Sequence, residues 1–279
     1  MNLNGYIDGL EKRAAESIKA EQGDFILDGL LHCGKCNTPK QTRIMIFDKE
    51  RTPFCLCKCE VEKRDREEEA RRRVEFEKRV KQLRSTGFPD SDMADCRFAN
   101  DDKANGKITA VMQNYVENFD RMRANGKGLL LFGPTGTGKT FSAACVANAL
   151  IDRGIPVLMT NFARIRNIVQ GMHDKRQEYF DELCRVPLLI LDDLSAESKS
   201  EYMQEIVYNV IDSRYRAKMP LIVTTNLTRD ELKFPAEMTN QRTFSRLFEM
   251  CIPIEVTGSD RRREKLKDDM KEYKDVLGL

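Results

Sequence analysis

A glycine-rich segment in the middle of the chain has the residues that a phosphate-binding loop requires. Residues 133–140 read Gly-Pro-Thr-Gly-Thr-Gly-Lys-Thr and fit the pattern G-x-x-x-x-G-K-[ST] in full. Glycines let backbone N–H groups wrap around phosphate oxygens, Lys139 can reach the β- and γ-phosphates, and the Thr140 hydroxyl can bind Mg²⁺. The segment therefore predicts an ATP–Mg²⁺ site. Its candidate nucleotide-binding residues are Gly133, Pro134, Thr135, Gly136, Thr137, Gly138, Lys139 and Thr140.

Two carboxylates and an amide follow later apolar segments. Asp192 and Asp193 end the apolar run that starts at Leu188, and Asn226 follows the run 221–225. Ligands of parallel sheets bind at the carboxyl ends of the strands, so we expect these groups beside the phosphate loop. Asp192 is expected in the Mg²⁺ shell, and Asp193 is expected to act on the attacking water as general base or orienter. Asn226 can hydrogen-bond both the γ-phosphate and that water.

Five of the nine cysteines lie between residues 33 and 59. A C-x₂-C pair followed by a second thiol pair is typical of a structural zinc site, and metal binding would fold a segment too short to build its own core. The preferred ligands are Cys33, Cys36, Cys57 and Cys59, with Cys55 as the alternative to one of the last pair. Free thiols and an iron–sulfur cluster are the other interpretations. Alternating apolar residues within 43–47 predict a small hairpin between the two thiol pairs.

The elements that must position these groups are predicted by hydrophobic periodicity. Apolar residues repeat at helical spacing from Ile108 to Phe119. Short apolar runs then alternate with amphipathic segments, which favours a parallel sheet covered by helices on both faces. The expected strands are 128–132, 156–160, 188–191, 221–225 and 251–256, and a helix over 141–152 follows the phosphate loop.

Between the cysteines and the predicted sheet lies a segment of almost continuous charge. Residues 60–84 include ten basic and eight acidic side chains, with opposite charges at i,i+4 such as Glu68–Arg72 and Glu69–Arg73. Such pairs support an exposed single helix, which is a spacer or a partner-binding helix, and Gly87 and Pro89 are expected to end it. The predicted organisation is an N-terminal helix and zinc module over 1–59, a helical linker over 60–87 and an ATPase domain over 88–279.

Composition narrows the class of protein. The chain has 279 residues, of which 41% are hydrophobic, and its net charge is +2. This balance excludes a wholly disordered chain and a general electrostatic attraction to nucleic acid or membranes. No apolar run approaches the roughly 18 residues of a membrane span, and the N-terminus lacks the apolar region of a secretory signal. We therefore expect a cytoplasmic protein without membrane contact.

The combined motifs resemble AAA+ ATPases of the DnaC/DnaI helicase-loader type and the IstB-type transposition ATPases of the same clade. The resemblance rests on residues 133–140, on Leu188–Asp193 running into Leu194-Ser-Ala-Glu197, on Thr224-Thr-Asn226, and on Arg242-Thr-Phe-Ser-Arg246-Leu. It covers about residues 127–265. It implies an α/β fold with a parallel sheet in the order 5-1-4-3-2 and no separate lid domain.

The resemblance also implies roles for single residues. Asn226 matches the first phosphate sensor, and Arg246 matches the arginine finger, with Arg242 one helical turn earlier as its companion. Arg262 is the preferred second phosphate-sensing arginine, although Arg261 and Arg263 are close enough to leave the register open. Ser200 and Tyr202 match positions that contact single-stranded DNA. Many AAA+ proteins have Glu where this chain has Asp193, and the shorter acid implies slow ATP hydrolysis that suits a switch.

The expected function is that of a bacterial or prophage-type replication ATPase. The N-terminal module would engage a hexameric replicative helicase, and the ATPase domain would bind ATP and single-stranded DNA, self-assemble on them and help to load the helicase. The alternative is a transposition helper that binds duplex DNA and a transposase. A third interpretation is an adaptor that binds nucleotide without hydrolysing it.

Overall fold

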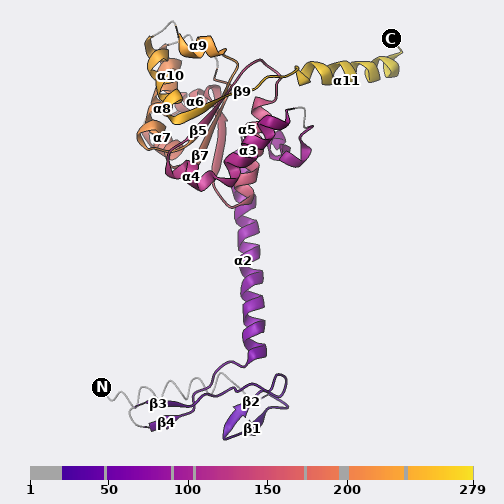
Figure 1. Ribbon diagram of the computed structural model, residues 1–279, viewed down its shortest axis with the longest axis vertical. Helices are drawn as coiled ribbons and strands as arrows, with labels where there is room; N and C mark the ends of the chain where they lie inside the picture. Colours follow the sequence, from indigo (N-terminus) through magenta and orange to yellow (C-terminus); the bar gives the residue numbers. More distant parts are fainter. Residues whose placement is uncertain are drawn as a thin grey trace. The chain divides into compact units, whose positions relative to one another are not determined.

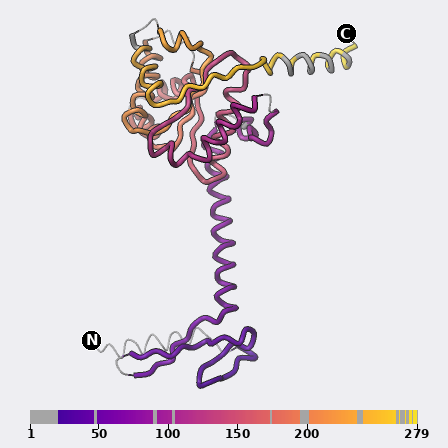
Figure 2. Tube along the Cα trace, in the orientation of Figure 1, coloured from indigo at the N-terminus to yellow at the C-terminus, as the bar shows by residue number. Residues whose placement is uncertain are grey.

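A computed structural model of the chain describes residues 21–46, 49–88, 91–102, 105–172, 175–194, 201–235 and 238–278 (Figure 2). The chain divides into two compact units, Met1–Glu77 and Lys78–Leu279. None of the helices in the described ranges is long and apolar enough to cross a membrane.

The N-terminal unit is built from two short antiparallel hairpins. Strands β1 (Phe25–Leu27) and β2 (Leu30–His32) form the first, and β3 (Ile44–Ile46) and β4 (Lys49–Arg51) form the second. The second hairpin confirms the one predicted over 43–47. A buried ion pair between Lys40 Nζ and Asp24 Oδ2, at 2.8 Å, connects the segment between the two hairpins with the start of β1. The predicted N-terminal helix lies outside the described residues.

Helix α2 (Lys58–Gly87) contains the charged segment. Side chains four residues apart pair along it, including Glu68 with Arg72 as predicted, while Arg73 pairs with Glu77 and not with Glu69. The helix ends at Gly87, where an added Cβ would lie only 2.7 Å from the carbonyl oxygen of Val157. Glycine therefore lets the last turn of α2 approach the sheet. Two short 3₁₀ helices follow, η1 (Ser91–Asp95) and η2 (Phe98–Asn100).

The C-terminal unit contains a five-stranded parallel sheet (Figure 1). Its strands are β5 (Gly128–Phe132), β6 (Val157–Asn161), β7 (Leu188–Asp192), β8 (Leu221–Thr225) and β9 (Cys251–Glu255). They lie in the order β6-β7-β8-β5-β9, and every pairing is parallel. Numbered from one to five along the chain and read from β9, this is the order 5-1-4-3-2. Pro253, which cannot donate a ladder hydrogen bond, is tolerated because β9 is an edge strand.

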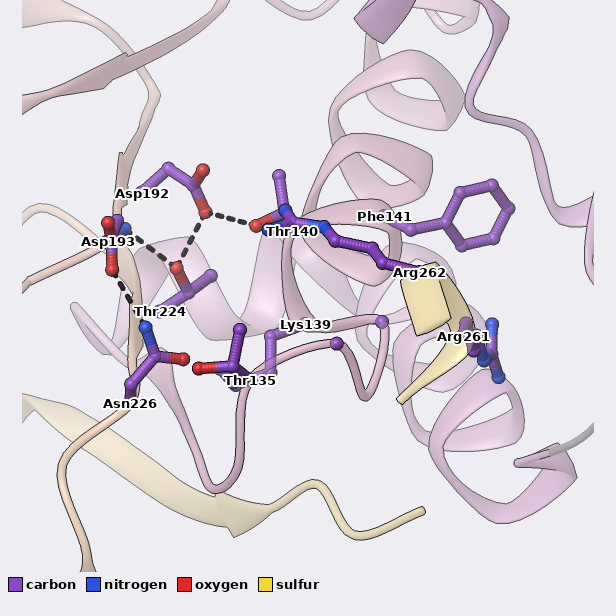
Figure 3. A pocket seen from close by; sticks show the side chains of 12 residues that line it. Thr135, Lys139, Thr140, Phe141, Asp192, Asp193, Thr224, Asn226, Arg261 and Arg262 are labelled. Carbon is purple, nitrogen blue, oxygen red and sulfur yellow. Dashed lines mark hydrogen bonds between the residues drawn. The ribbon is translucent and has the colours of Figure 1, made fainter. Parts of the chain in front are cut away.

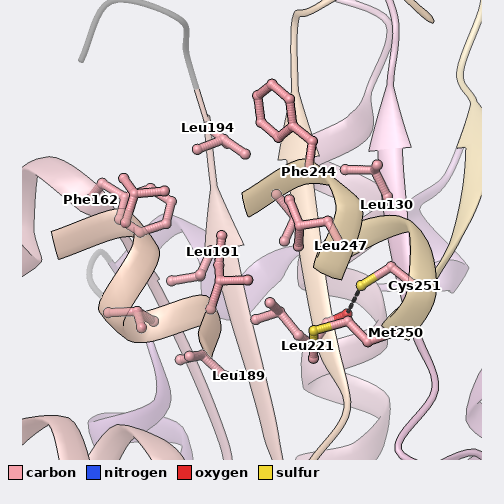
Figure 4. Close-up of a cluster of buried hydrophobic side chains, with 14 of the residues drawn as sticks. Leu130, Phe162, Leu189, Leu191, Leu194, Leu221, Phe244, Leu247, Met250 and Cys251 are labelled. Atoms are coloured by element: carbon pink, nitrogen blue, oxygen red, sulfur yellow. Dashed lines mark hydrogen bonds between the residues drawn. The ribbon is translucent and has the colours of Figure 1, made fainter. Parts of the chain in front are cut away.

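Helices cover both faces of this sheet, as the continuous apolar strands require. On one face, α3 (Gly106–Glu117) and α5 (Lys139–Asp152) pack over a core that includes Leu129, Leu131 and Ile190. On the other face, α6 (Phe162–Gln170), α7 (Arg176–Arg185), α8 (Glu201–Arg216) and α10 (Met238–Met250) enclose Leu189, Leu191 and Leu247 (Figure 4). The remaining helices are α4 (Phe119–Ala124), α9 (Arg229–Lys233) and α11 (Arg261–Leu277).

Candidate functional site

The loop between β5 and α5 has the backbone conformation of a phosphate cradle. Gly133 and Gly136 have φ values of 135° and 79°, which side-chain-bearing residues rarely adopt. A Cβ on Gly133 would lie 2.5 Å from the carbonyl oxygen of Val256, and one on Gly136 would lie 2.1 Å from Asp260 Oδ1. The loop leads into α5, whose N-terminal N–H groups are suited to bind an anion. The conformation therefore fits a bound phosphate chain.

Lys139 is the charged group of this loop. Its side chain is 7% exposed, and Nζ donates hydrogen bonds to the carbonyl oxygens of Gly133, at 2.8 Å, and Pro134, at 2.7 Å. Burial lowers the pKa of Lys139, and the nearby carboxylates of Asp193 and Asp192 oppose that shift. This buried ammonium group is hydrogen-bonded to neutral carbonyl oxygens. A bound phosphate, which is negatively charged, would stabilise it more strongly.

Two side chains at the carboxyl ends of β7 and β8, Asp192 and Thr224, form one hydrogen-bonded network with Thr140 of the loop (Figure 3). Asp192 Oδ1 accepts hydrogen bonds from the hydroxyls of Thr140, at 2.8 Å, and Thr224, at 2.6 Å. Thr224 Oγ1 in turn accepts from the backbone N–H of Asp193, at 2.9 Å. Thr140 and Asp192 are therefore together, as a shared Mg²⁺ site requires.

Asp193 and Asn226 also meet. Asn226 Nδ2 donates to Asp193 Oδ1 at 3.1 Å, and Asp193 has a φ of 57°, which is unusual for a residue other than glycine. Strained backbone of this kind clusters at functional sites. The predicted water-orienting acid and the predicted phosphate sensor thus face the same space.

These groups line a cavity of about 310 Å³, in which Arg261 and Arg262 also lie. In Figure 3 the Arg262 side chain extends toward Thr140, whereas Arg261 points away. Arg261 pairs with Asp102, at 3.2 Å, and Arg263 pairs with Asp260, at 3.4 Å. Arg261 Nη1 nevertheless lies 3.2 Å from where a Cβ on Gly138 would be, so the choice of Arg262 among the three arginines stays a prediction.

The four preferred cysteines form a second cluster, in the N-terminal unit. The sulfur atoms of Cys33, Cys36, Cys57 and Cys59 all lie within 4.8 Å of one another. Four thiolates around one zinc ion at about 2.3 Å would be about 3.8 Å apart, so the donor set fits this metal. Cys55 is outside the cluster, and its Sγ lies 3.6 Å from the carbonyl oxygen of Pro39.

Arg246 lies on α10 and is not among the residues that line the nucleotide cavity. Its Nη1 is 2.8 Å from Asp212 Oδ1 of α8. An arginine finger acts on a nucleotide held by a neighbouring subunit, and a position away from the chain's own cavity is compatible with that role.

The structure describes one of the two predicted DNA-contact residues. Ser200 lies outside the described residues. Tyr202 packs against the hydrophobic core beside α8, and its hydroxyl is buried. A contact between Tyr202 and DNA stays a prediction. In this conformation the helical periodicity of α8 turns the ring toward the apolar face that also carries Ile206 and Val210.

Sequence reasoning gave no role to Thr224, which holds Asp192 and the backbone of Asp193 at once. Its only sequence signal was its place at the end of a strand, next to Asn226. Phe141, which also lines the cavity, had no distinguishing pattern either, whereas Arg261 was one of the three arginines that the sequence left open.

Comparison with known proteins identifies the family. The model of the family described as IstB-like ATP binding protein matches residues 59–268, which is most of the chain. The chain belongs to the IstB-like ATP-binding family. This family is of the AAA+ helicase-loader type that the motifs resemble.

Each of the following individual relatives matches only part of this chain. The replicative helicase loader DnaI of Bacillus subtilis is 25% identical over 207 residues, which are 69% of this chain and 66% of the relative. The replicative helicase loader DnaC of Escherichia coli K12 is 27% identical over 159 residues, 54% of this chain and 62% of the relative. The chain thus spans slightly less than two thirds of the length of either. A Sinorhizobium fredii putative insertion sequence ATP-binding protein is 35% identical over 112 residues, 38% of this chain and 36% of the relative.

Solved structures show the same fold. A crystal structure of DnaI superimposes with a TM-score of 0.54 and 25% identity, covering 64% of this chain and 99% of that one. A crystal structure of the DnaC helicase loader gives a TM-score of 0.51 at 22% identity, covering 60% and 100%. The IstB-like assignment and the cavity therefore agree on an ATP-binding AAA+ domain.

Proposed function

We propose that this IstB-like protein hydrolyses ATP, binds single-stranded DNA and loads a replicative ring helicase, with hydrolysis as the release switch. The observation that carries the ATPase part is the network that joins Thr140, Asp192 and Thr224 at the mouth of the phosphate loop. The helicase part is supported by similarity to two proteins named as replicative helicase loaders.

In this proposal each cavity residue has a role. Lys139 neutralises the β- and γ-phosphates, and Arg262 contacts the phosphate chain from the start of α11. Thr140 and Asp192 hold Mg²⁺, which when bound supplies charge neutralisation of the phosphates. Asp193 orients the attacking water, and Asn226 fixes that carboxylate. Slow turnover is expected because Asp193 is short and its carboxylate is already engaged by Asn226.

Arg246 would complete the site of a neighbouring subunit. Its guanidinium would stabilise the charge that develops on the γ-phosphate, so assembly on ATP and DNA would be required for hydrolysis. The cysteine cluster would hold one structural zinc ion, and the N-terminal unit that it stabilises would contact the helicase.

The Lys139→Ala variant tests the ATP site. We expect loss of ATP binding with an unchanged unfolding temperature, because the lysine meets phosphate charge that exists only with bound nucleotide. The matched control is Lys233→Ala, which removes an exposed lysine from α9. Isothermal titration with ATP and steady-state phosphate release are the measurements. Wild-type ATP affinity in Lys139→Ala would contradict the proposed site.

The similarity to an insertion sequence ATP-binding protein favours one second candidate, a transposition helper. Affinity purification of the tagged full chain, from cells that carry its natural genomic neighbours, separates the two. The loader proposal predicts that a ring helicase is recovered, whereas the second candidate predicts a transposase.

A further inference from the structure

Arg246 contacts three side chains of α8, Tyr208, Asp212 and Tyr215, and Arg216 pairs with Asp212; we call these four residues the Arg246 cradle. The central guanidinium carbon lies 4.7 Å from the centre of the Tyr208 ring and 5.7 Å from that of Tyr215. Tyr208, Asp212 and Tyr215 are spaced at i, i+4 and i+7, so they share one face of α8. Packing of α10 on α8 therefore places Arg246 over both rings and beside the carboxylate.

Asp212 serves two arginines at once. Its Oδ1 lies 2.8 Å from Arg246 Nη1, and its Oδ2 lies 2.8 Å from Arg216 Nη2, one helical turn further along α8. The Asp212 side chain is only 10% exposed, whereas that of Arg216 is 74% exposed. A buried carboxylate without a counter-ion is strongly unfavourable. Because Arg216 stays in place, Asp212 can release Arg246 and still be neutralised.

The contact between Arg246 and Asp212 is a charge contact without hydrogen-bond geometry. Arg246 Nη1 and Asp212 Oδ1 are both buried and neither has a hydrogen-bond partner among the described residues. Buried donors normally have an acceptor. The other nearby carboxylate, Glu249, accepts the Tyr215 hydroxyl at 2.9 Å and forms no ion pair with Arg246 in the described part of the chain. Arg246 Nη1 can therefore still donate a hydrogen bond to a second anion.

We propose that Asp212 is a positioning residue that retains Arg246 in the free subunit and competes for it with the γ-phosphate of a neighbouring subunit. This inference rests on the proposed trans role of Arg246. A phosphate group carries more charge than a carboxylate and can accept two parallel hydrogen bonds from a guanidinium. Asp212 left beside the arginine would oppose the stabilisation of developing charge, so Arg246 must exchange Asp212 for phosphate, while Arg216 remains on Asp212.

The cradle predicts effects of opposite sign for two neighbouring substitutions. Asp212→Asn removes the competing charge, so the protein concentration needed for half-maximal ATP hydrolysis should fall about threefold, the size expected for one partly exposed ion pair. Arg216→Gln leaves Arg246 as the sole counter-ion of Asp212, so the same concentration should rise about threefold. A purely structural role would shift both variants in the same direction, through lower stability.

The experiment has two stages. First, Arg246→Ala is mixed with Lys139→Ala, and recovery of ATPase activity above the sum of the separate variants establishes the trans role. Then Asp212→Asn and Arg216→Gln are titrated at saturating ATP, alone and in the Arg246→Ala background, where both effects should disappear. Failure of mixing overturns the proposed role of Arg246 itself. Recovery on mixing, followed by equal or same-sign shifts in the two variants, overturns the cradle alone.

Folding is controlled separately. Thermal unfolding of each variant shows whether Asp212→Asn remains native. If it does not, Arg216→Gln still decides the matter, because it changes a side chain that is 74% exposed. An unchanged or lower half-maximal concentration in Arg216→Gln would contradict the proposal.

Discussion

At the scale of single residues, the chemistry of this chain depends on contacts that join consecutive strand ends. Asp192 and Asp193 are adjacent in sequence but make different contacts. The Thr224 hydroxyl donates to the Asp192 carboxylate and accepts from the backbone N–H of Asp193. Asn226 then fixes the second carboxylate. The two acids therefore face different partners, Thr140 and Asn226, from one strand end.

The Thr224→Val substitution tests this arrangement. The variant keeps the shape of the side chain and removes the hydroxyl, which leaves the backbone N–H of Asp193 without its acceptor. We expect kcat to fall roughly tenfold with little change in ATP affinity, because misplacement of a catalytic group by a fraction of an ångström has effects of this size. Thr224→Ser retains the hydroxyl and should restore most of the activity. Equal kcat values for the Thr224→Val variant and the wild-type protein would remove Thr224 from the site.

Residue-level prediction from the sequence is most direct where the functional groups are consecutive. The phosphate loop is eight neighbouring residues, and its chemistry can be read from their types. Contacts such as Thr224 with Asp192, or Asp212 with Arg246, require two elements to lie side by side, and single-sequence periodicity does not show which side chains then meet. The direction of the Tyr202 side chain is a related case, because its place on α8 turns the ring toward the hydrophobic core.

At the scale of elements, every predicted strand of the central sheet is present within one residue of its expected bounds. These strands are continuous apolar runs, and burial on both faces determines their type. The hairpins of the N-terminal unit are different, because β1 exposes Phe25, Ile26 and Leu27 and buries little. Their predicted stability comes from the metal site, since their apolar residues do not form a core.

Metal removal tests that account. The purified chain should contain one zinc ion per molecule, and Cys33→Ser should lose it, because three thiolates hold zinc less tightly than four. Cys55→Ser is the matched control and should keep the metal, since Cys55 lies outside the cluster. Elemental analysis gives the metal content, and circular dichroism in chelator reports the hairpins. Zinc loss in Cys55→Ser but not in Cys33→Ser would show that the ligand set is wrong.

At the scale of the whole molecule, the division into two units gives the chain two separate sources of stability. The ATPase unit has a hydrophobic core on both faces of its sheet. The N-terminal unit has a cysteine cluster and a buried ion pair. Chelation of zinc should therefore disrupt partner binding through the N-terminal unit and leave ATP binding intact.

The measurement that tests the central claim most directly is ATP-switched helicase loading. Closed circular single-stranded DNA, coated with a single-strand-binding protein and annealed to a short labelled oligonucleotide, is incubated with the replicative ring helicase of the same cell. We predict that strand displacement requires the full chain and ATP, and that Lys139→Ala abolishes it while Lys233→Ala does not. Displacement that is equally fast without the chain, or equally fast with Lys139→Ala, would contradict the proposal that this protein is an ATP-dependent helicase loader.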